Sequence, residues 1–352
     1  MFNYISCSAL PRKDDSMSFY YSFDRLFSYQ FLLAFVLTER GLGKTFGIKK
    51  AMLKKFLKTG EQFIYVRRYK SELDSALATF WSDLQNNGYF EDLDLKVKKK
   101  KMLTEFTCDG EVCGYAVPLS TANILKSTAF PKVTNIVFDE FLIDDTGLYK
   151  YLKNEINLTL DLMETVFRLK DGQMIFLGNA ISITNPYFAY WNLDLPYNSE
   201  FKTFHNGLIV VNYARNEEYR KVKKASRFGQ LIENTSYGRY AIDNVMLKDD
   251  IHFIKKRPPD SRFFGLLIIN GTNIGIWNSK NGHLYMSEKY EPNTSHKFAC
   301  DYTDHTEDTV FLNARENYYL NLCIKYYKQG LLRFENQKVK NICTRLLNRC
   351  II

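Results

Sequence analysis

The stretch Phe31–Thr45, FLLAFVLTERGLGKT, passes from an apolar run through a glycine-containing loop into Lys-Thr. The seven apolar residues Phe31–Leu37 predict a buried strand, and Thr45–Leu57 has the spacing of an amphipathic helix. Small residues between a strand and a helix let backbone N–H groups close around an anion, and the helix dipole favours negative charge there. The stretch therefore predicts a phosphate-binding loop.

The same loop predicts which groups bind a nucleotide. Lys44 would reach the β and γ phosphates, and the Thr45 hydroxyl would ligate Mg²⁺. The full Walker A pattern, G-x-x-x-x-G-K-[ST], has glycine where this chain has Thr38, so the loop is a variant that is expected to approach phosphate less closely. The predicted ATP-binding residues are Thr38, Arg40, Gly41, Leu42, Gly43, Lys44 and Thr45.

A second motif, NIVFDEF at Asn135–Phe141, is an apolar strand that ends in two acids. Asp139 would hold Mg²⁺, and Glu140 would polarise the attacking water. Together with Lys44, this acidic motif favours an ATPase. A kinase would need a pocket for a phosphate acceptor, and the sequence has no signal for one.

Two further positions have candidate catalytic roles. Arg168 ends a helical stretch, Asn154–Arg168, and could be an arginine finger that stabilises charge on the transferred phosphoryl group. It could equally be a surface arginine that the helix dipole favours. Asn179 closes the strand that contains Met174–Leu177, where it either orients the lytic water or caps a turn.

The first half of the chain alternates strands with helices, which predicts an α/β fold with a mostly parallel sheet. Further strands are expected at Gln62–Arg67 and Asn135–Phe138, and a helix at Ser71–Asn87. A meander is expected from Leu93 to Pro118, with its tight turn at Asp109-Gly110.

The sequence becomes polar after about Arg215, which predicts a linker that begins with a helix at Asn216–Arg227. A small α+β domain is expected to follow. The predicted domains are residues 1–213, 214–250 and 251–352. The last contains strands at Arg262–Ile269, Asn273–Asn278 and His283–Ser287, then helices at Asn313–Gln329 and Leu331–Arg349.

Composition limits the classes of protein that this chain can be. With 45% hydrophobic residues, the 352-residue chain can build real cores, so wholesale disorder is excluded. Its longest apolar run is far shorter than the about 20 residues that cross a bilayer, and its start does not have the pattern of a secretory signal. The seven cysteines include no CxxC pair, so free thiols in a cytosolic protein are expected rather than a zinc site.

These segments together resemble the DNA-packaging ATPases of small tailed phages, the φ29-like group. The resemblance covers nearly the whole chain. It is carried by RGLGKT at Arg40–Thr45, GEQFIYVRRYKSEL at Gly60–Leu73, AVPLS at Ala116–Ser120, NIVFDEF at Asn135–Phe141, METVFR at Met163–Arg168, GNAISITNPYF at Gly178–Phe188, RFGQLIENTSYG at Arg227–Gly238 and GLLRFENQ at Gly330–Gln337.

The resemblance implies a ring, typically a homopentamer, that uses ATP to pump double-stranded DNA into a preformed procapsid. Its partners would be further copies of itself, the DNA and the procapsid portal, in the cytoplasm of the infected bacterium; the need for a scaffold RNA stays open. The implied fold is an additional-strand P-loop (ASCE) ATPase domain, a small linker domain and a C-terminal ribonuclease H-like domain.

The resemblance also implies roles for basic residues. Arg168 falls where the family has an arginine finger that acts on the neighbouring subunit. Arg67, Arg68 and Lys70 match the basic string YVRRYK and would contact the nucleotide or the adjacent subunit, or else are ordinary charges at a strand end.

The net charge of +9 favours a polyanionic partner but is equally typical of a soluble basic protein. A packaging motor must ignore DNA sequence, so its contacts would be mostly to phosphates. The candidate DNA-binding residues are Lys98, Lys99, Lys100 and Lys101, whose alternative is a solvated hairpin face, together with Lys150 and Lys153.

Two other functions remain possible from the sequence. A packaging enzyme with a live metal-dependent nuclease would need clustered carboxylates, but the strand Phe263–Ile269 has no acid, and Asp301, Asp304 and Asp308 lie further on. A vestigial nuclease fold is therefore expected. The second alternative is a P-loop protein that only binds nucleotide, as a structural or regulatory module.

Overall fold

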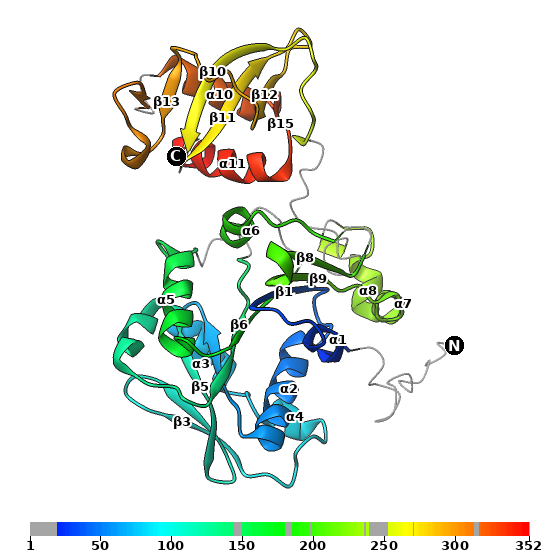
Figure 1. Ribbon diagram of the computed structural model, residues 1–352. Helices are drawn as coiled ribbons and strands as arrows, with labels where there is room; N and C mark the ends of the chain where they lie inside the picture. The colour runs from blue at the N-terminus through cyan, green and yellow to red at the C-terminus, as the bar shows by residue number, and fades with distance from the viewer. Residues whose placement is uncertain are drawn as a thin grey trace, which may run out of the picture. The chain divides into compact units, whose positions relative to one another are not determined.

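The structure is a computed structural model that describes residues 20–143, 150–179, 185–196, 199–235, 237–238, 253–269, 271–312 and 317–351. The chain divides into two compact units (Figure 1): Met1–Ser182 with Leu195–Leu247, and Ile183–Asp194 with Lys248–Ile352. The predicted linker, residues 214–250, falls mostly in the first unit, and its part from 239 to 250 lies outside the described residues. Residues 1–19 and the predicted helix start at 313–316 also lie outside them.

The first unit is built on a nine-stranded sheet with the order β3-β4-β5-β2-β6-β7-β1-β9-β8. The strands from β5 through β9 in this order are parallel to one another, as the sequence predicted. Antiparallel strands close both edges. The strands are β1 (Leu33–Thr38), β2 (Gln62–Arg67), β3 (Leu95–Lys99), β4 (Thr104–Cys108), β5 (Glu111–Pro118), β6 (Val133–Asp139), β7 (Gln173–Asn179), β8 (Phe201–Phe204) and β9 (Ile209–Tyr213).

Helices cover both faces of this sheet, with α2 and α5 on opposite sides (Figure 1). Every residue of β1 is buried, as expected for a parallel strand between two helical layers. One face of the sheet packs Ala34 and Val36 in a core shared with α2, and the other stacks Phe35 on Phe176. The helices of this unit are α1 (Asp24–Phe27), α2 (Lys44–Thr59), α3 (Lys70–Leu77), α4 (Ser82–Asn86), α5 (Glu155–Phe167), α7 (Glu217–Ala225) and α8 (Arg227–Ile232).

The single helix predicted at Ser71–Asn87 is wrong, because α3 ends at Leu77 and α4 begins at Ser82. The break lets two adjacent aromatic residues, Phe80 and Trp81, both enter the core. In a continuous helix, neighbouring residues point about 100° apart, which makes it harder for two large rings in a row to reach one core partner. Here both rings contact Phe106, with Phe80 stacked on it at 4.1 Å between ring centroids.

The sheet order brings the two predicted motifs to one edge. Strand β7 lies between β1, which leads into the glycine loop, and β6, which ends in Asp139. The strand that ends in Asn179 therefore lies directly beside the strand that ends in Asp139. Because the carboxyl ends of parallel strands meet at the same edge, residues 38–45, 139–140 and 179 converge there.

The second unit has a six-stranded sheet with the order β14-β13-β10-β11-β12-β15. The strands β10, β11 and β12 form an antiparallel meander, and the remaining neighbours pair in parallel. The predicted helix at Leu331–Arg349 begins later than expected, because Leu332–Phe334 pairs with β12 instead. The elements are α6 (Pro186–Trp191), β10 (Arg262–Ile269), β11 (Thr272–Asn278), β12 (Leu284–Ser287), β13 (Lys297–Ala299), β14 (Val310–Phe311), α10 (Tyr318–Lys328), β15 (Leu332–Phe334) and α11 (Gln337–Ile351).

Candidate nucleotide site

The glycine loop connects β1 directly to α2, as predicted. Gly41 and Gly43 have φ values of 91° and 80°, in the left-handed region that favours glycine. Gly43 is also the N-cap of α2, and a Cβ atom there would lie only 2.8 Å from the ring of Tyr20. The loop therefore has the backbone shape that an anion-binding strand–helix junction requires.

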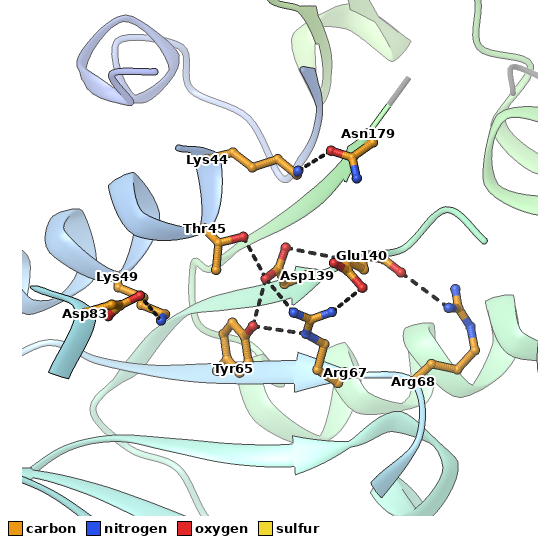
Figure 2. Close-up of polar contacts among 10 residues, drawn as sticks. All are labelled: Lys44, Thr45, Lys49, Tyr65, Arg67, Arg68, Asp83, Asp139, Glu140 and Asn179. Carbon is orange, nitrogen blue, oxygen red and sulfur yellow. Dashed lines mark hydrogen bonds and ion pairs between the residues drawn. The ribbon is translucent and has the colours of Figure 1, made fainter. Parts of the chain in front are cut away.

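Lys44 is the first residue of α2, and its side chain meets Asn179 across the site (Figure 2). The Lys44 Nζ atom donates a hydrogen bond to Asn179 Oδ1 at 2.6 Å. Burial lowers the pKa of Lys44, and the carboxylates of Asp139 and Glu140 offset only part of this effect. The structure thus brings together two residues that the sequence proposed for different roles.

Asp139 is fully buried and accepts three polar contacts at its Oδ2 atom (Figure 2). Thr45 Oγ1 donates to it at 3.0 Å, the Tyr65 hydroxyl at 2.8 Å, and Arg67 forms an ion pair at 3.2 Å. Burial alone would raise the pKa of Asp139, but Arg67, Lys44 and the hydrogen bonds outweigh it and hold the pKa below its usual value. The result is an ionised carboxylate beside a hydroxyl, and both are oxygen ligands that suit Mg²⁺.

Glu140 follows Asp139 with a φ of 58°, which is uncommon for a residue with a side chain and turns the chain sharply at the strand end. Its carboxylate is about half exposed and pairs with Arg67, with 2.6 Å between Glu140 Oε2 and the guanidinium. The same guanidinium donates from Nε to the Tyr65 hydroxyl at 3.1 Å. Arg67 therefore bridges the two acids of the site within one subunit.

The expectation that Arg68 contacts the nucleotide or an adjacent subunit is wrong for this structure. Arg68 is only 1% exposed and pairs with Glu155 through two hydrogen bonds, at 2.8 and 2.9 Å. It also donates to the backbone carbonyl of Phe141 at 2.6 Å. Arg68 is thus committed to the interior, where it ties α5 to the loop after Glu140, whereas Lys70 is exposed at the start of α3.

Arg168 lies away from the other site residues, at the exposed C-terminal end of α5. Its backbone has a φ of 51°, and its guanidinium makes no hydrogen bond or ion pair with any described residue. The loop beyond it is fixed, because Lys170 Nζ donates to the backbone carbonyls of Phe130 and Pro131 at 2.6 and 3.3 Å. Arg168 is therefore held outward on a fixed turn, next to a fully exposed Leu169.

The remaining predicted residues occupy varied surroundings. Thr38 and Leu42 are buried, and Arg40 reaches the hydroxyl of Tyr237 at 3.3 Å. In the lysine cluster, Lys99 pairs with Asp74 and Lys100 with Glu105, whereas Lys98 and Lys101 form no ion pair within the described ranges. Lys150 and Lys153 are exposed.

Sequence reasoning missed Tyr65, Arg220 and the role of Arg67 inside the subunit. Tyr65 and Arg67 lie on β2, two residues apart and next to β6, so they share a face of the sheet and both reach Asp139. The string YVRRYK contains both residues, but their contacts with Asp139 could be predicted only by knowing that β2 pairs with β6. Arg220 contacts Glu39 of the loop from α7, and no local pattern connects these two residues.

Two cysteines lie near the predicted tight turn of the meander. Cys108 and Cys113 are buried free thiols on either side of the Asp109-Gly110 turn, and burial raises the pKa of Cys113 to about 12. Among the described residues, no group of three or more His, Cys, Asp or Glu side chains is placed to hold a metal ion between them. In the part of the chain that the structure describes, no helix is both long and apolar enough to cross a membrane.

The fold and the site define a P-loop protein of the α/β class. Three features meet at one edge of the sheet: a glycine loop, a lysine and a threonine that begin a helix, and a buried aspartate. The aspartate ends β6, which is separated from β1 by one strand, β7. The chain belongs to the family of podovirus DNA encapsidation proteins (Gp16), whose family model matches residues 15–352. The resemblance seen in the sequence is thereby confirmed.

Individual relatives agree with this family. The chain is 36% identical over 335 residues to the DNA packaging protein of Bacillus phage phi29, covering 94% of this chain and 98% of that protein. A chain of the bacteriophage Phi-29 viral genome packaging motor assembly is 34% identical, with a TM-score of 0.75 and coverage of 94% of this chain and 99% of that one. The N-terminal domain of the DNA packaging ATPase from bacteriophage phi29 is 38% identical, with a TM-score of 0.50, and covers 57% of this chain and 98% of that one.

Proposed function

We propose that this protein is the ATP-driven motor that moves double-stranded phage DNA into a preformed procapsid. The observation that carries the proposal is the convergence of Lys44, Thr45, Asp139 and Glu140 at one sheet edge, in a chain that belongs to the encapsidation family. The motor acts in the host cytoplasm as a ring of copies of this chain docked on the procapsid portal.

The geometry suggests a role for each group at the site. Lys44 binds the β and γ phosphates, and Thr45 with Asp139 would hold Mg²⁺. Bound Mg²⁺ neutralises charge on the phosphates. Glu140 accepts a proton from the attacking water, and Asn179, which is already hydrogen-bonded to Lys44, orients that water or senses the γ phosphate.

A ring gives a role to Arg168, which is exposed at the end of α5. We infer that Arg168 completes the site of the neighbouring subunit, where it stabilises charge on the transferred phosphoryl group. Its exposed guanidinium and positive φ on a fixed turn support this assignment. Backbone strain of this kind is common at functional positions.

We infer that the C-terminal unit is a ribonuclease H-like domain without nuclease activity. An antiparallel meander, β10 to β12, extended beside β10 by the parallel strands β13 and β14, is the arrangement of that fold, and β15 adds a further parallel strand beside β12. Asp301 and Asp308 are exposed, and Asp304 accepts a hydrogen bond from the Gly271 backbone at 2.8 Å. A live nuclease predicts plasmid cleavage with Mg²⁺ or Mn²⁺ that is lost in Asp301→Asn or Asp304→Asn, and such cleavage would overturn this inference.

ATP hydrolysis with and without double-stranded DNA tests the main proposal. We expect DNA-stimulated hydrolysis by the wild type, and a loss of about 10²-fold or more in Glu140→Gln, because a general base contributes about 10²–10⁴-fold. Lys44→Ala should also lose hydrolysis, whereas Lys58→Ala, on the exposed end of α2, should not. ATP binding without any hydrolysis would instead support a purely regulatory nucleotide-binding protein.

A further inference from the structure

Helix α7 lies on the glycine loop, although the sequence placed it at the start of a linker. Strand β9 runs parallel to β1, and the chain leaving it stays alongside, with Ala214 N–H donating to the Leu37 carbonyl at 2.9 Å. The Asn216 side chain then caps α7 by accepting from Tyr219 N–H. This path delivers the first turns of α7 to the loop residues that follow β1.

The first contact between α7 and the loop is an ion pair. Glu39, in the middle of the loop motif, is fully buried, and its Oε1 atom accepts from Arg220 Nε at 2.5 Å. Burial raises the pKa of Glu39 in spite of the guanidinium beside it, so its ionised form is less favourable here than in water.

The pair is also incompletely satisfied. Glu39 Oε2 and one terminal nitrogen of Arg220 are buried without a hydrogen-bond partner in the described part of the chain. The two unsatisfied atoms belong to one ion pair, and a second hydrogen bond between them would give the bidentate form that arginine and carboxylate prefer.

The second contact fixes a peptide of the loop. Lys223 Nζ and the Tyr219 hydroxyl both donate to the Arg40 carbonyl, at 2.6 and 3.2 Å. In a trans peptide, the carbonyl and the following N–H point in opposite directions. By holding the Arg40 carbonyl, α7 sets the direction of the Gly41 N–H, which is a backbone donor of the phosphate-binding loop.

Gly41 also shows how closely the helix approaches. A Cβ atom at this position would lie 2.4 Å from the Tyr219 hydroxyl oxygen, and its φ of 91° favours glycine in any case. The hydroxyl of Tyr237, beyond α8, contacts the Arg40 side chain at 3.3 Å. The loop is therefore contacted by two separate parts of the segment that follows β9.

We propose that Arg220, Tyr219 and Lys223 of α7 are positioning residues for the phosphate loop and couple ATP binding to the segment that continues from α7. The inference rests on the proposed function, since it concerns the same nucleotide. Coupling between two sites is reciprocal: if the α7 contacts strengthen ATP binding, bound ATP strengthens the α7 contacts by the same free energy. Nucleotide state is thereby passed to a part of the chain outside the sheet.

The experiment measures equilibrium binding of Mg-ATP to the full chain by calorimetry in Arg220→Gln, Glu39→Gln and the double variant. We expect each single variant to bind about 5- to 50-fold more weakly, within the usual range of coupling between sites. The double variant should bind no more weakly than the worse single variant, because both changes break one contact. Lys221→Gln removes a charge from the exposed face of the same helix and should bind ATP like the wild type.

Two additions separate positioning from a loss of fold. Lys223→Met, at a half-buried position where misfolding is a smaller risk, should weaken ATP binding about 2- to 10-fold while thermal unfolding stays near that of the wild type. Amide hydrogen exchange in α7 should slow when ATP binds to the wild type, and this response should be lost in Arg220→Gln.

The outcomes distinguish the two proposals. Wild-type ATP affinity in folded Arg220→Gln and Lys223→Met, with α7 exchange unresponsive to ATP, would overturn the coupling and leave the proposed function intact. An absence of ATP binding by the wild type would overturn the proposed function, and the coupling with it.

Discussion

At the scale of single residues, Arg67 determines the electrostatics of the site. Its guanidinium contacts both Asp139 and Glu140, and it is the nearby positive charge that lowers the pKa of Asp139 most. The side chain is itself only 12% exposed, so water screens these interactions weakly. Arg67 thus keeps a buried aspartate ionised and holds the neighbouring glutamate in one place.

Replacing Arg67 by glutamine should destabilise the protein in a pH-dependent way. A carboxyl whose pKa is lowered by folding adds stability above its unfolded-state pKa, near 3.8, and that stability disappears as the pH falls through the folded-state pKa. In the variant the pKa of Asp139 rises, so the contribution shrinks. We expect the free energy of unfolding to fall by about 1–3 kcal/mol at pH 7, the cost of removing a partner from a buried acceptor.

The difference between the Arg67→Gln variant and the wild type should narrow once the pH falls below about 3.8, because only there does Asp139 become protonated in the wild type as well as in the variant. Urea titrations at pH 7, at pH 4 and at a pH well below 3.8 measure this trend. Lys54→Gln, which removes an exposed charge from α2, should match the wild type at each pH. A difference that stayed constant with pH would show that Arg67 acts through packing and not through the ionisation of Asp139.

How much of the site could be predicted depended on whether its residues are neighbours in the chain. Lys44, Thr45, Asp139 and Glu140 belong to short motifs that end a strand or begin a helix, so local pattern was sufficient to find them. Arg67 and Arg68 look alike in the sequence, yet one faces the acids and the other is buried against Glu155. Their surroundings differ because side chains alternate between the two faces of the sheet at the end of β2, and because β2 pairs with β6.

At the scale of elements, the pair between Arg68 and Glu155 connects α5 to the sheet edge. Both side chains are 1% exposed, and the guanidinium also binds the carbonyls of Glu140 and Phe141. The helix that carries Arg168 at its far end is therefore anchored at its first residue to the loop that carries Glu140. In the proposed ring, Glu140 acts in its own subunit and Arg168 in the neighbouring one, so this ion pair connects the two elements that carry them.

Breaking this pair from one side should cost more than removing it completely. Arg68→Met leaves the Glu155 carboxylate buried without its partner, and we expect a loss of about 3–5 kcal/mol in the free energy of unfolding. The double variant Arg68→Met with Glu155→Leu removes both charges and should recover most of that loss, as measured by urea titration at pH 7. Equal stability of the single and double variants would contradict a buried ion pair.

Element boundaries could be predicted where one local signal dominates. Strands β2 and β10 begin and end where the sequence placed them, because each is an apolar run between polar turns. Strand β9 was not expected, although all five of its residues are buried beside β1. Its sequence, IVVNY, is short and contains a polar Asn212, and its place in the sheet depends on a pairing distant in the chain.

At the scale of the whole molecule, the net charge of +9 matters for DNA binding mainly where lysine side chains are exposed and not paired with acids. In the cluster on β3 and its turn, two lysines pair with surface acids, and exposed pairs of this kind contribute little to stability. Lys98 and Lys101 are exposed and form no such pair within the described ranges. If the cluster binds DNA, we therefore expect these two lysines to supply its phosphate contacts.

The double variant Lys98→Gln/Lys101→Gln should weaken binding to double-stranded DNA and flatten its dependence on salt. Each lost phosphate contact reduces the slope of log K against log salt by about 0.9. Fluorescence anisotropy with a labelled duplex, over a series of salt concentrations, measures both quantities. Lys54→Gln/Lys58→Gln removes the same charge from α2, and a slope change equal to that of the test variant would mean that only net charge matters.

The proposed ring makes a prediction that no single subunit can test. Arg168→Ala removes the finger and keeps Glu140, whereas Glu140→Gln removes the base and keeps the finger. Each pure variant should hydrolyse ATP at least about 10²-fold more slowly than the wild type when assembled on procapsids with DNA. If the finger acts on the neighbouring subunit, a mixed ring contains interfaces in which an intact Glu140 meets an intact Arg168.

With equal amounts and random mixing, about a quarter of the interfaces in the mixed ring are intact, so hydrolysis should rise well above that of either pure variant. If Arg168 served its own subunit, every subunit in the mixture would still lack one group and no activity would return. The separation within one subunit favours the first outcome, since Arg168 is exposed at the end of α5 and contacts none of the described site residues. Rings formed by both variants but inactive in every mixture would refute a finger acting between subunits.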